Sequence, residues 1–144
     1  MYKTILLAYD GSQEGRLALR EGANLAQICS AKVVLLAVVN MSIGIAMAET
    51  VGPGAAQRQT EDYQSILDQG IEHLTQMGLV PVGRLEIGEP VDCIADVAAE
   101  TDADLVVVGH HRQNLLGRWL LGSVTEALID KLECSLLSAR SDHV

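Results

Sequence analysis

The residues best suited to chemistry lie between two glycines in the second half of the sequence. The segment Gly109–Arg112, with the sequence GHHR, directly follows the apolar run Leu105–Val108, which is typical of a buried strand. Gly122 then precedes Ser123, and the spacing of Ser123 and Glu126 predicts a capping box at a helix start. Unpaired N–H groups and the helix dipole attract anions there, and glycine has no Cβ to block close approach. The pattern therefore predicts a phosphate site.

A second polar group follows the first apolar run of the chain. The run from Thr4 to Tyr9 ends in Asp10-Gly11-Ser12, a sequence typical of a turn between a strand and a helix. The Asp10 carboxylate could contact a ligand, or it could serve only as the cap of the following helix.

The two histidines of the glycine segment do not predict a metal site. His110 and His111 are adjacent, so in extended chain their side chains point in opposite directions and cannot chelate one metal ion. No metal-binding residues are therefore predicted.

Composition limits the class of protein. The 144 residues predict a single domain over residues 1–144, and 49% of them are apolar, which suits an aliphatic core under a parallel sheet. The formal charge of −9 and the scattered 10 basic residues argue against nucleic acid as a partner. Cys29, Cys93 and Cys134 lie far apart, which predicts reduced thiols and a cytoplasmic location. No apolar stretch approaches the roughly 20 residues that would insert into a membrane.

Apolar patterning alternates strands with helices along the chain. Strands are expected at 4–9, 33–39, 82–87, 105–108 and 136–137. Apolar positions at helical spacing predict helices from Leu17 to Ile28, Tyr63 to Met77, Pro90 to Ala98 and Ser123 to Leu132, with a long connection from Asn40 to Ala55. This order predicts an α/β fold with a doubly wound parallel sheet, in which the alternating strand 82–87 lies at an edge.

In such a sheet the ligand lies beyond the carboxyl ends of the strands, where the strand order reverses. If strands 4–9 and 105–108 are neighbours, the Asp10 turn and the Gly109 segment face one crevice. Val38 and Val39, at the end of the second strand, would add an apolar wall.

The chain also resembles the universal stress protein family, over nearly every element from Lys3 to Arg140. Its nucleotide-binding members carry Gly-x-x-Gly, nine residues, then Gly-Ser or Gly-Thr, and this spacing joins Gly109 to Gly122-Ser123. The resemblance implies a flavodoxin-like or Rossmann-like sheet of five strands in the order 3-2-1-4-5, a homodimer, and ATP bound in some members. Carried over by position, the nucleotide would contact Ala8, Asp10, Val38, Gly109, His111, Gly122, Ser123, Val124 and Thr125.

One residue departs from the family pattern. Arg112 stands where the second glycine of the motif is expected. A side chain there could fill the phosphate cradle, and a left-handed backbone would cost it about 1–2 kcal/mol. Alternatively, its guanidinium could donate hydrogen bonds to the phosphates in place of backbone N–H groups.

These observations favour a stress-response regulatory protein that binds ATP, or ADP or AMP, with magnesium or manganese shared among the phosphates. No G-x-S-x-G, H-E-x-x-H or Walker A motif is present, so we expect no enzymatic activity beyond slow ATP hydrolysis. The alternative is a dimeric interaction protein with an empty pocket. An adenylating enzyme would need a Ser-Gly-Gly-type loop after the first strand, which Asp10–Gln13 does not supply.

A homodimer is predicted to form through the last strand. Leu136 and Leu137 belong to a strand at the end of the predicted sheet, and an unpaired apolar edge strand is a template for pairing with a second copy.

Overall fold

The computed structural model describes residues 1–40, 52, 54–109 and 122–140. The strands in this part of the chain are β1 (Thr4–Ala8), β2 (Lys32–Asn40), β3 (Val82–Gly88), β4 (Leu105–Gly109) and β5 (Ser135–Ala139). The helices are α1 (Gln13–Cys29), α3 (Ala55–Gln76), α4 (Pro90–Glu100) and α5 (Gly122–Lys131). Each element falls within a few residues of its predicted range, except that α3 begins two turns before Tyr63.

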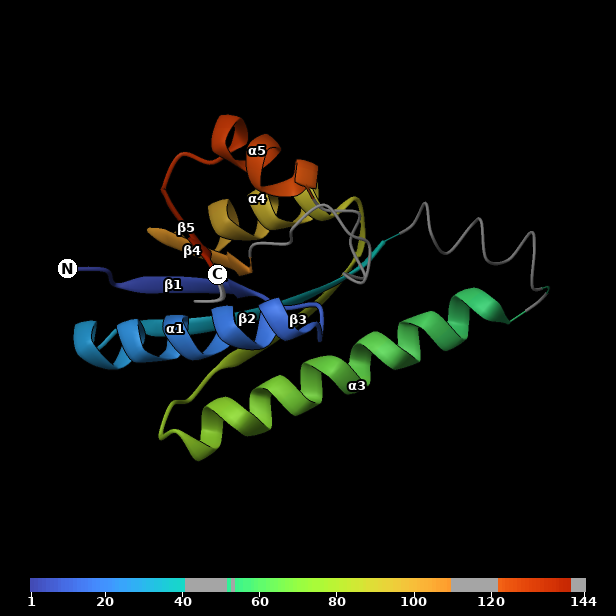
Figure 1. Ribbon diagram of the computed structural model, residues 1–144, viewed down its shortest axis with the longest axis horizontal. Helices are drawn as coiled ribbons and strands as arrows, with labels where there is room; N and C mark the ends of the chain where they lie inside the picture. Colours follow the sequence, from blue (N-terminus) through green and yellow to red (C-terminus); the bar gives the residue numbers. More distant parts are fainter. Residues whose placement is uncertain (41–51, 53, 110–121, 141–144) are drawn as a thin grey trace.

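The strands form one parallel sheet in the order β3-β2-β1-β4-β5, which confirms the predicted topology (Figure 1). Strand β1 is central, with Ala8 opposite Leu36 of β2 and Leu7 opposite Val107 of β4. The strand order reverses between β1 and β4, because the chain leaves β1 toward β2 and returns to β4 after β3. The carboxyl ends of β1 and β4 therefore form the switch point where a doubly wound sheet binds ligands.

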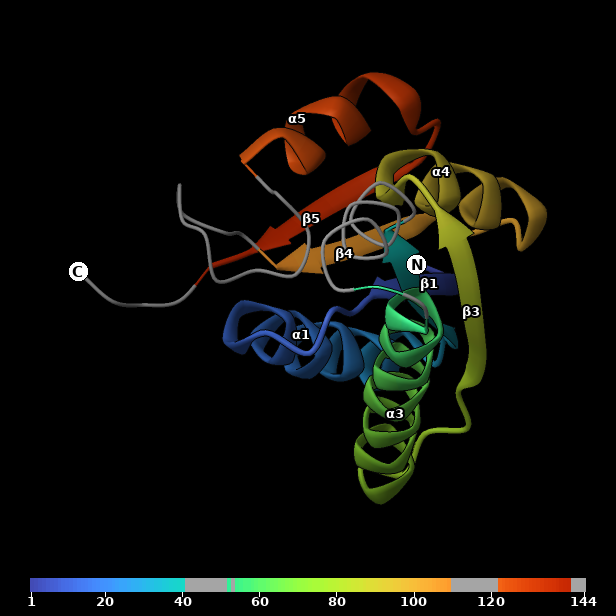
Figure 2. The same ribbon diagram turned by 90° about the vertical axis from the view of Figure 1, so that its right-hand side faces the viewer.

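The helices cover both faces of the sheet. Figures 1 and 2 show α1 and α3 on one face and α4 and α5 on the other. Glycines allow the first pair to pack closely: a Cβ on Gly22 of α1 would strike Leu7, and one on Gly70 of α3 would lie 2.7 Å from Leu35. Leu7 and Leu35 thus point toward α1 and α3. Since side chains alternate along a strand, Ala8 and Val38 point to the other face of the sheet, which α4 and α5 cover.

The two edges of the sheet differ in charge. Pro81 precedes the edge strand β3, and Arg84 on this strand forms ion pairs with Glu86 at 3.4 Å and Glu100 at 2.9 Å. The other edge strand, β5, carries serines, leucines and an alanine. Charge and proline are common protections against unwanted strand pairing, so β3 is the better protected edge. The prediction that the strand 82–87 lies at an edge is confirmed.

Among the described residues, no helix combines the length and the apolar content that a bilayer span requires. The three cysteines are half-buried and form no disulfide. Cys93 and Cys134 pack against the hydrophobic core.

Candidate functional site

The turn after β1 is built around the Asp10 carboxylate, which is 2% exposed. Its Oδ1 accepts hydrogen bonds from the backbone N–H of Ser12, at 2.9 Å, and from the Ser12 hydroxyl. The Ser12 hydroxyl in turn accepts from the N–H of Gly15, at 3.0 Å, and is the N-cap of α1. The alternative that Asp10 caps the helix is therefore wrong: Ser12 is the N-cap, and Asp10 holds Ser12 in place.

The end of β4 lies directly against the first turn of α1. A Cβ on Gly109 would come within 2.6 Å of the carbonyl carbon and oxygen of Glu14, and within 2.9 Å of the Gly15 nitrogen. Real Cβ contacts are not this short, so only glycine fits between β4 and α1. The end of β4 and the first turn of α1, which follows the Asp10 turn, are thus in van der Waals contact. Gly109 has a packing role in addition to any role in ligand binding.

Tyr9 fixes this turn to both helices of its layer. A Cβ on Gly15 of α1 would lie 3.3 Å from the Tyr9 ring, and one on Gly70 of α3 would lie 3.1 Å from it. Burial raises the pKa of the Tyr9 hydroxyl, while the nearby Arg16 acts in the opposite direction. Tyr9 therefore stays neutral and positions the turn that carries Asp10.

The remaining predicted residues fall on three elements. Ala8 and Val38 are 3% and 0% exposed, so their side chains belong to the core and contact with a ligand would use their backbone. On α5, Val124 is 9% exposed and Thr125 is half-buried. α5 begins at Gly122, so Ser123 is the second residue of the helix and not the N-cap that the capping box predicts. His111 and Arg112 lie outside the described part of the structure.

The structure adds two buried polar residues that sequence reasoning missed. Asn40, the last residue of β2, is 6% exposed, and Gln59 of α3 is 7% exposed. Gln59 continues the stripe of Tyr63 and Ile66 at helical spacing. Its position in line with these apolar residues is the feature of the sequence that indicates a buried glutamine.

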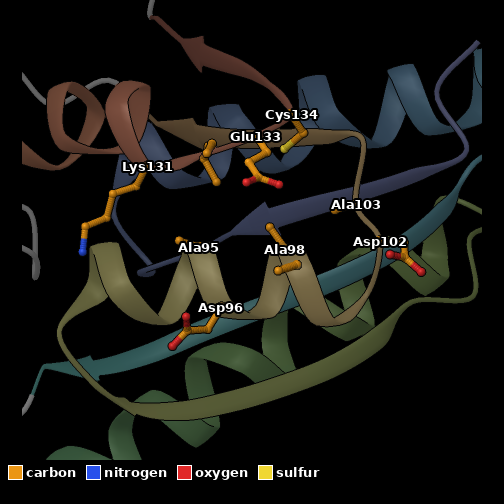
Figure 3. A pocket seen from close by; sticks show the side chains of 10 residues that line it. Ala95, Asp96, Ala98, Asp102, Ala103, Lys131, Glu133 and Cys134 are labelled. Atoms are coloured by element: carbon orange, nitrogen blue, oxygen red, sulfur yellow. The ribbon is translucent and has the colours of Figure 1, made fainter.

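The structure also has a hollow of about 540 Å³, far from these residues, between α4 and the turn before β5 (Figure 3). Its floor consists of alanines, among them Ala95 and Ala98, and Asp96, Asp102 and Glu133 contribute carboxylates. It lies at the amino ends of β4 and β5, the edge of the sheet opposite Asp10. The net negative charge of its lining does not suit a phosphate.

Comparison with known proteins agrees with this architecture. The universal stress protein family profile matches residues 1–140. A protein of Staphylococcus saprophyticus assigned to the universal stress proteins is 30% identical and aligns with 99% of this chain and 86% of its own. The solved structure of the hypothetical protein MJ0577 is 26% identical, with a TM-score of 0.82 and coverage of 100% and 99% of the two chains.

A universal stress protein from Archaeoglobus fulgidus, solved in complex with dAMP, is 22% identical with a TM-score of 0.73, and the alignment covers 96% of this chain and 98% of that one. Its likeness shows the same fold. Together, the family match over nearly the whole chain, the strand order and the relatives identify this protein: it belongs to the universal stress protein family.

Proposed function

We propose that this protein binds ATP at the carboxyl ends of β1 and β4 and acts as a regulatory protein of the stress response. The observation that carries the proposal is the contact of Gly109 with Glu14 and Gly15, which joins both strand ends to the hydrogen-bonded Asp10 turn. This is the switch point at which doubly wound sheets bind nucleotides.

Each part of the site suits a different part of a nucleotide. A carboxylate after a strand recognises ribose hydroxyls in other nucleotide-binding folds, so we assign Asp10 to the sugar. The first turn of α5, with Gly122, Ser123, Val124 and Thr125, supplies backbone N–H groups and the positive end of a helix dipole, so we assign it to the phosphates. Because the chain is acidic, it offers little positive charge to the phosphates. Magnesium or manganese would then neutralise the phosphate charge.

Solved relatives support an adenine nucleotide as the ligand. Besides the Archaeoglobus complex with dAMP, a universal stress protein has been solved with cAMP and an Arabidopsis member with AMP. ADP or AMP would use the same sugar and base contacts as ATP, with fewer contacts to α5.

The described cysteines support a regulatory role rather than covalent catalysis. Burial raises the pKa of the Cys93 and Cys134 thiols, so both stay protonated at neutral pH and are poor nucleophiles. We infer at most slow ATP hydrolysis. Three free thiols also fit a reducing compartment, which supports the proposal of a cytoplasmic location.

Arg112 favours one alternative function. An arginine in place of the motif glycine could close the phosphate cradle, which would leave a dimeric interaction protein with an empty pocket. Both proposals include a homodimer through β5, where Leu136 and Leu137 are half-buried at the sheet edge.

Mass spectrometry of nucleotide released from freshly purified protein separates the two functions, and calorimetry with ATP, ADP and AMP measures the affinity. We expect adenine nucleotide in the preparation and ATP binding at micromolar or weaker affinity. Gly122→Val should abolish binding, since a β-branched side chain would stand where the phosphates approach the N–H groups. Ile129→Ala, at an exposed position of the same helix, is the matched control. No released nucleotide and no heat with any of the three would refute the proposal.

A further inference from the structure

Gln59 is a buried polar residue whose hydrogen bonding is incomplete. The residue is 7% exposed, and its Oε1 has no hydrogen-bond partner among the residues that the structure describes. An acceptor left unpaired in this way destabilises the folded protein. A residue that bears such a cost is a candidate for contact with a ligand.

Helix α3 packs against the Asp10 turn and extends beyond it at its amino end, where Gln59 lies. A Cβ on Gly11, next to Asp10, would lie 3.1 Å from Ile66, so α3 is packed against the Asp10 turn. Gln59 lies on the same face of α3 two helical turns earlier, about 10 Å along the axis. Gln59 is the fifth residue of α3, and Figure 1 shows this amino end of the helix extending past the carboxyl ends of the strands. It therefore lies toward the end of the sheet at which the nucleotide is proposed to bind.

The order of the strands indicates how the bound nucleotide would extend across the sheet. Phosphates assigned to α5 lie on the β4 side of β1, whereas α3 packs over β2 and β3 on the other side. Neighbouring strands are about 4.8 Å apart, so a ligand that extends from β4 to β2 crosses about 10 Å. A nucleotide with its ribose at Asp10 therefore directs its base toward β2 and α3.

The amide of glutamine matches one purine base. Its oxygen accepts from the N6 amino group of adenine, while its NH₂ donates to the adjacent ring nitrogen N7. Guanine presents the acceptor O6 in place of N6–H, so the glutamine oxygen would face another oxygen. We propose that Gln59 recognises the base and makes the site selective for adenine, an inference that rests on the proposed nucleotide site.

Binding measurements with three nucleotides test this role. We would titrate the protein and Gln59→Met with ATP, GTP and purine riboside triphosphate, which lacks the N6 amino group. Methionine keeps the length of the side chain and removes its hydrogen bonds. The parent should prefer ATP to GTP by about tenfold or more. Gln59→Met should bind ATP about tenfold more weakly and purine riboside triphosphate nearly as well as the parent does.

Stability and a second glutamine provide the controls. Because the unpaired oxygen is removed, the unfolding midpoint of Gln59→Met should equal or exceed that of the parent; Gln59→Leu serves as a second variant if methionine packs poorly. Gln57→Met, at an exposed position of the same helix, should change neither midpoint nor affinity. If the parent binds ATP but Gln59→Met shows the same ratio of ATP to GTP affinity, the role of Gln59 is overturned and the proposed nucleotide site is not. A parent that binds no nucleotide would overturn the proposed function together with it.

Discussion

A Cβ on Gly109 would lie 2.6 Å from the carbonyl carbon of Glu14, so β4 and α1 meet where no side chain has room. This contact links two segments that are far apart in the sequence. It makes the geometry of the Asp10 turn dependent on the end of β4.

Gly109→Ala should therefore lower the free energy of unfolding by about 1–3 kcal/mol, the usual cost of forcing extra atoms into a packed interface. It should also weaken nucleotide binding, because the displaced α1 carries the turn that holds Asp10. Gly78→Ala is the comparison: its Cβ would meet nothing within 4 Å, but its φ of +87° imposes a backbone cost of about 1–2 kcal/mol. Denaturant titration together with calorimetry measures both effects. Unchanged stability in Gly109→Ala would contradict the close contact.

Ser12→Ala should lower the free energy of unfolding by about 1 kcal/mol, because the N–H of Gly15 loses its capping acceptor. Asp10 would lose the hydroxyl that donates to its Oδ1 as well. Ser30→Gly, at the other end of α1, should act in the opposite direction, since Ser30 has a φ of 53° that glycine adopts without strain. Thermal unfolding of the two variants should give midpoints on either side of the parent value.

The Asp104 carboxylate should make stability depend on pH. Hydrogen bonds from the backbone N–H groups of Lys3, at 2.8 Å, and Thr4, at 3.1 Å, lower its pKa in the folded protein. A lowered pKa stabilises the fold above the unfolded-state pKa, and this contribution disappears as pH falls through the folded-state pKa. Asp104→Asn should thus destabilise the protein at neutral pH and matter less in acid. Denaturant titrations between neutral pH and about pH 3 measure this, since an unperturbed Asp titrates near 3.9.

Asp130→Asn, at an exposed position of α5, is the control for that series. A destabilisation by Asp104→Asn that stays constant over the whole pH range would show that the carboxylate charge has no part in fixing the start of β1.

The role of Arg112 can be determined by comparing the affinity for ATP with the affinity for adenosine. If its guanidinium contacts the phosphates, Arg112→Ala should weaken ATP binding and leave adenosine binding unchanged. If its side chain blocks the cradle, Arg112→Gly should create or strengthen ATP binding. Equal ATP affinities in the parent and both variants would exclude either role.

The homodimer should be sensitive to the edge of β5. Leu136→Asp or Leu137→Lys should shift the protein toward monomer by placing a charge in the seam, and Ser135→Lys tests the edge at an exposed position that does not disturb the core. Sedimentation equilibrium gives the association state, and circular dichroism verifies that each variant folds. A parent protein that is monomeric at every concentration up to the micromolar range is incompatible with this assembly.

Most of the fold could be predicted because its signals are local. Runs such as Leu105–Val108 are long enough to identify buried strands, and the alternation of strands and helices leaves few topologies. The first two turns of α3 were missed, because Ala55–Asp62 is mostly polar and lacks apolar periodicity. The site was less predictable, since it depends on contacts between distant segments. That Gly109 must make room for Glu14, and that Gln59 is buried, follow only from the packing of α1 and α3.

The unequal edges of the sheet limit how copies of this protein can associate. A twofold pair joined through β5 would form one continuous sheet of double width. Both of its outer strands would then be β3, with Pro81 before the strand and Arg84 held by Glu86 and Glu100. Growth by strand addition would end at the pair, because neither outer strand offers a further copy an uncharged edge. The ion pairs of β3, which add little to the stability of the monomer, would thus make the assembly finite rather than fibrous.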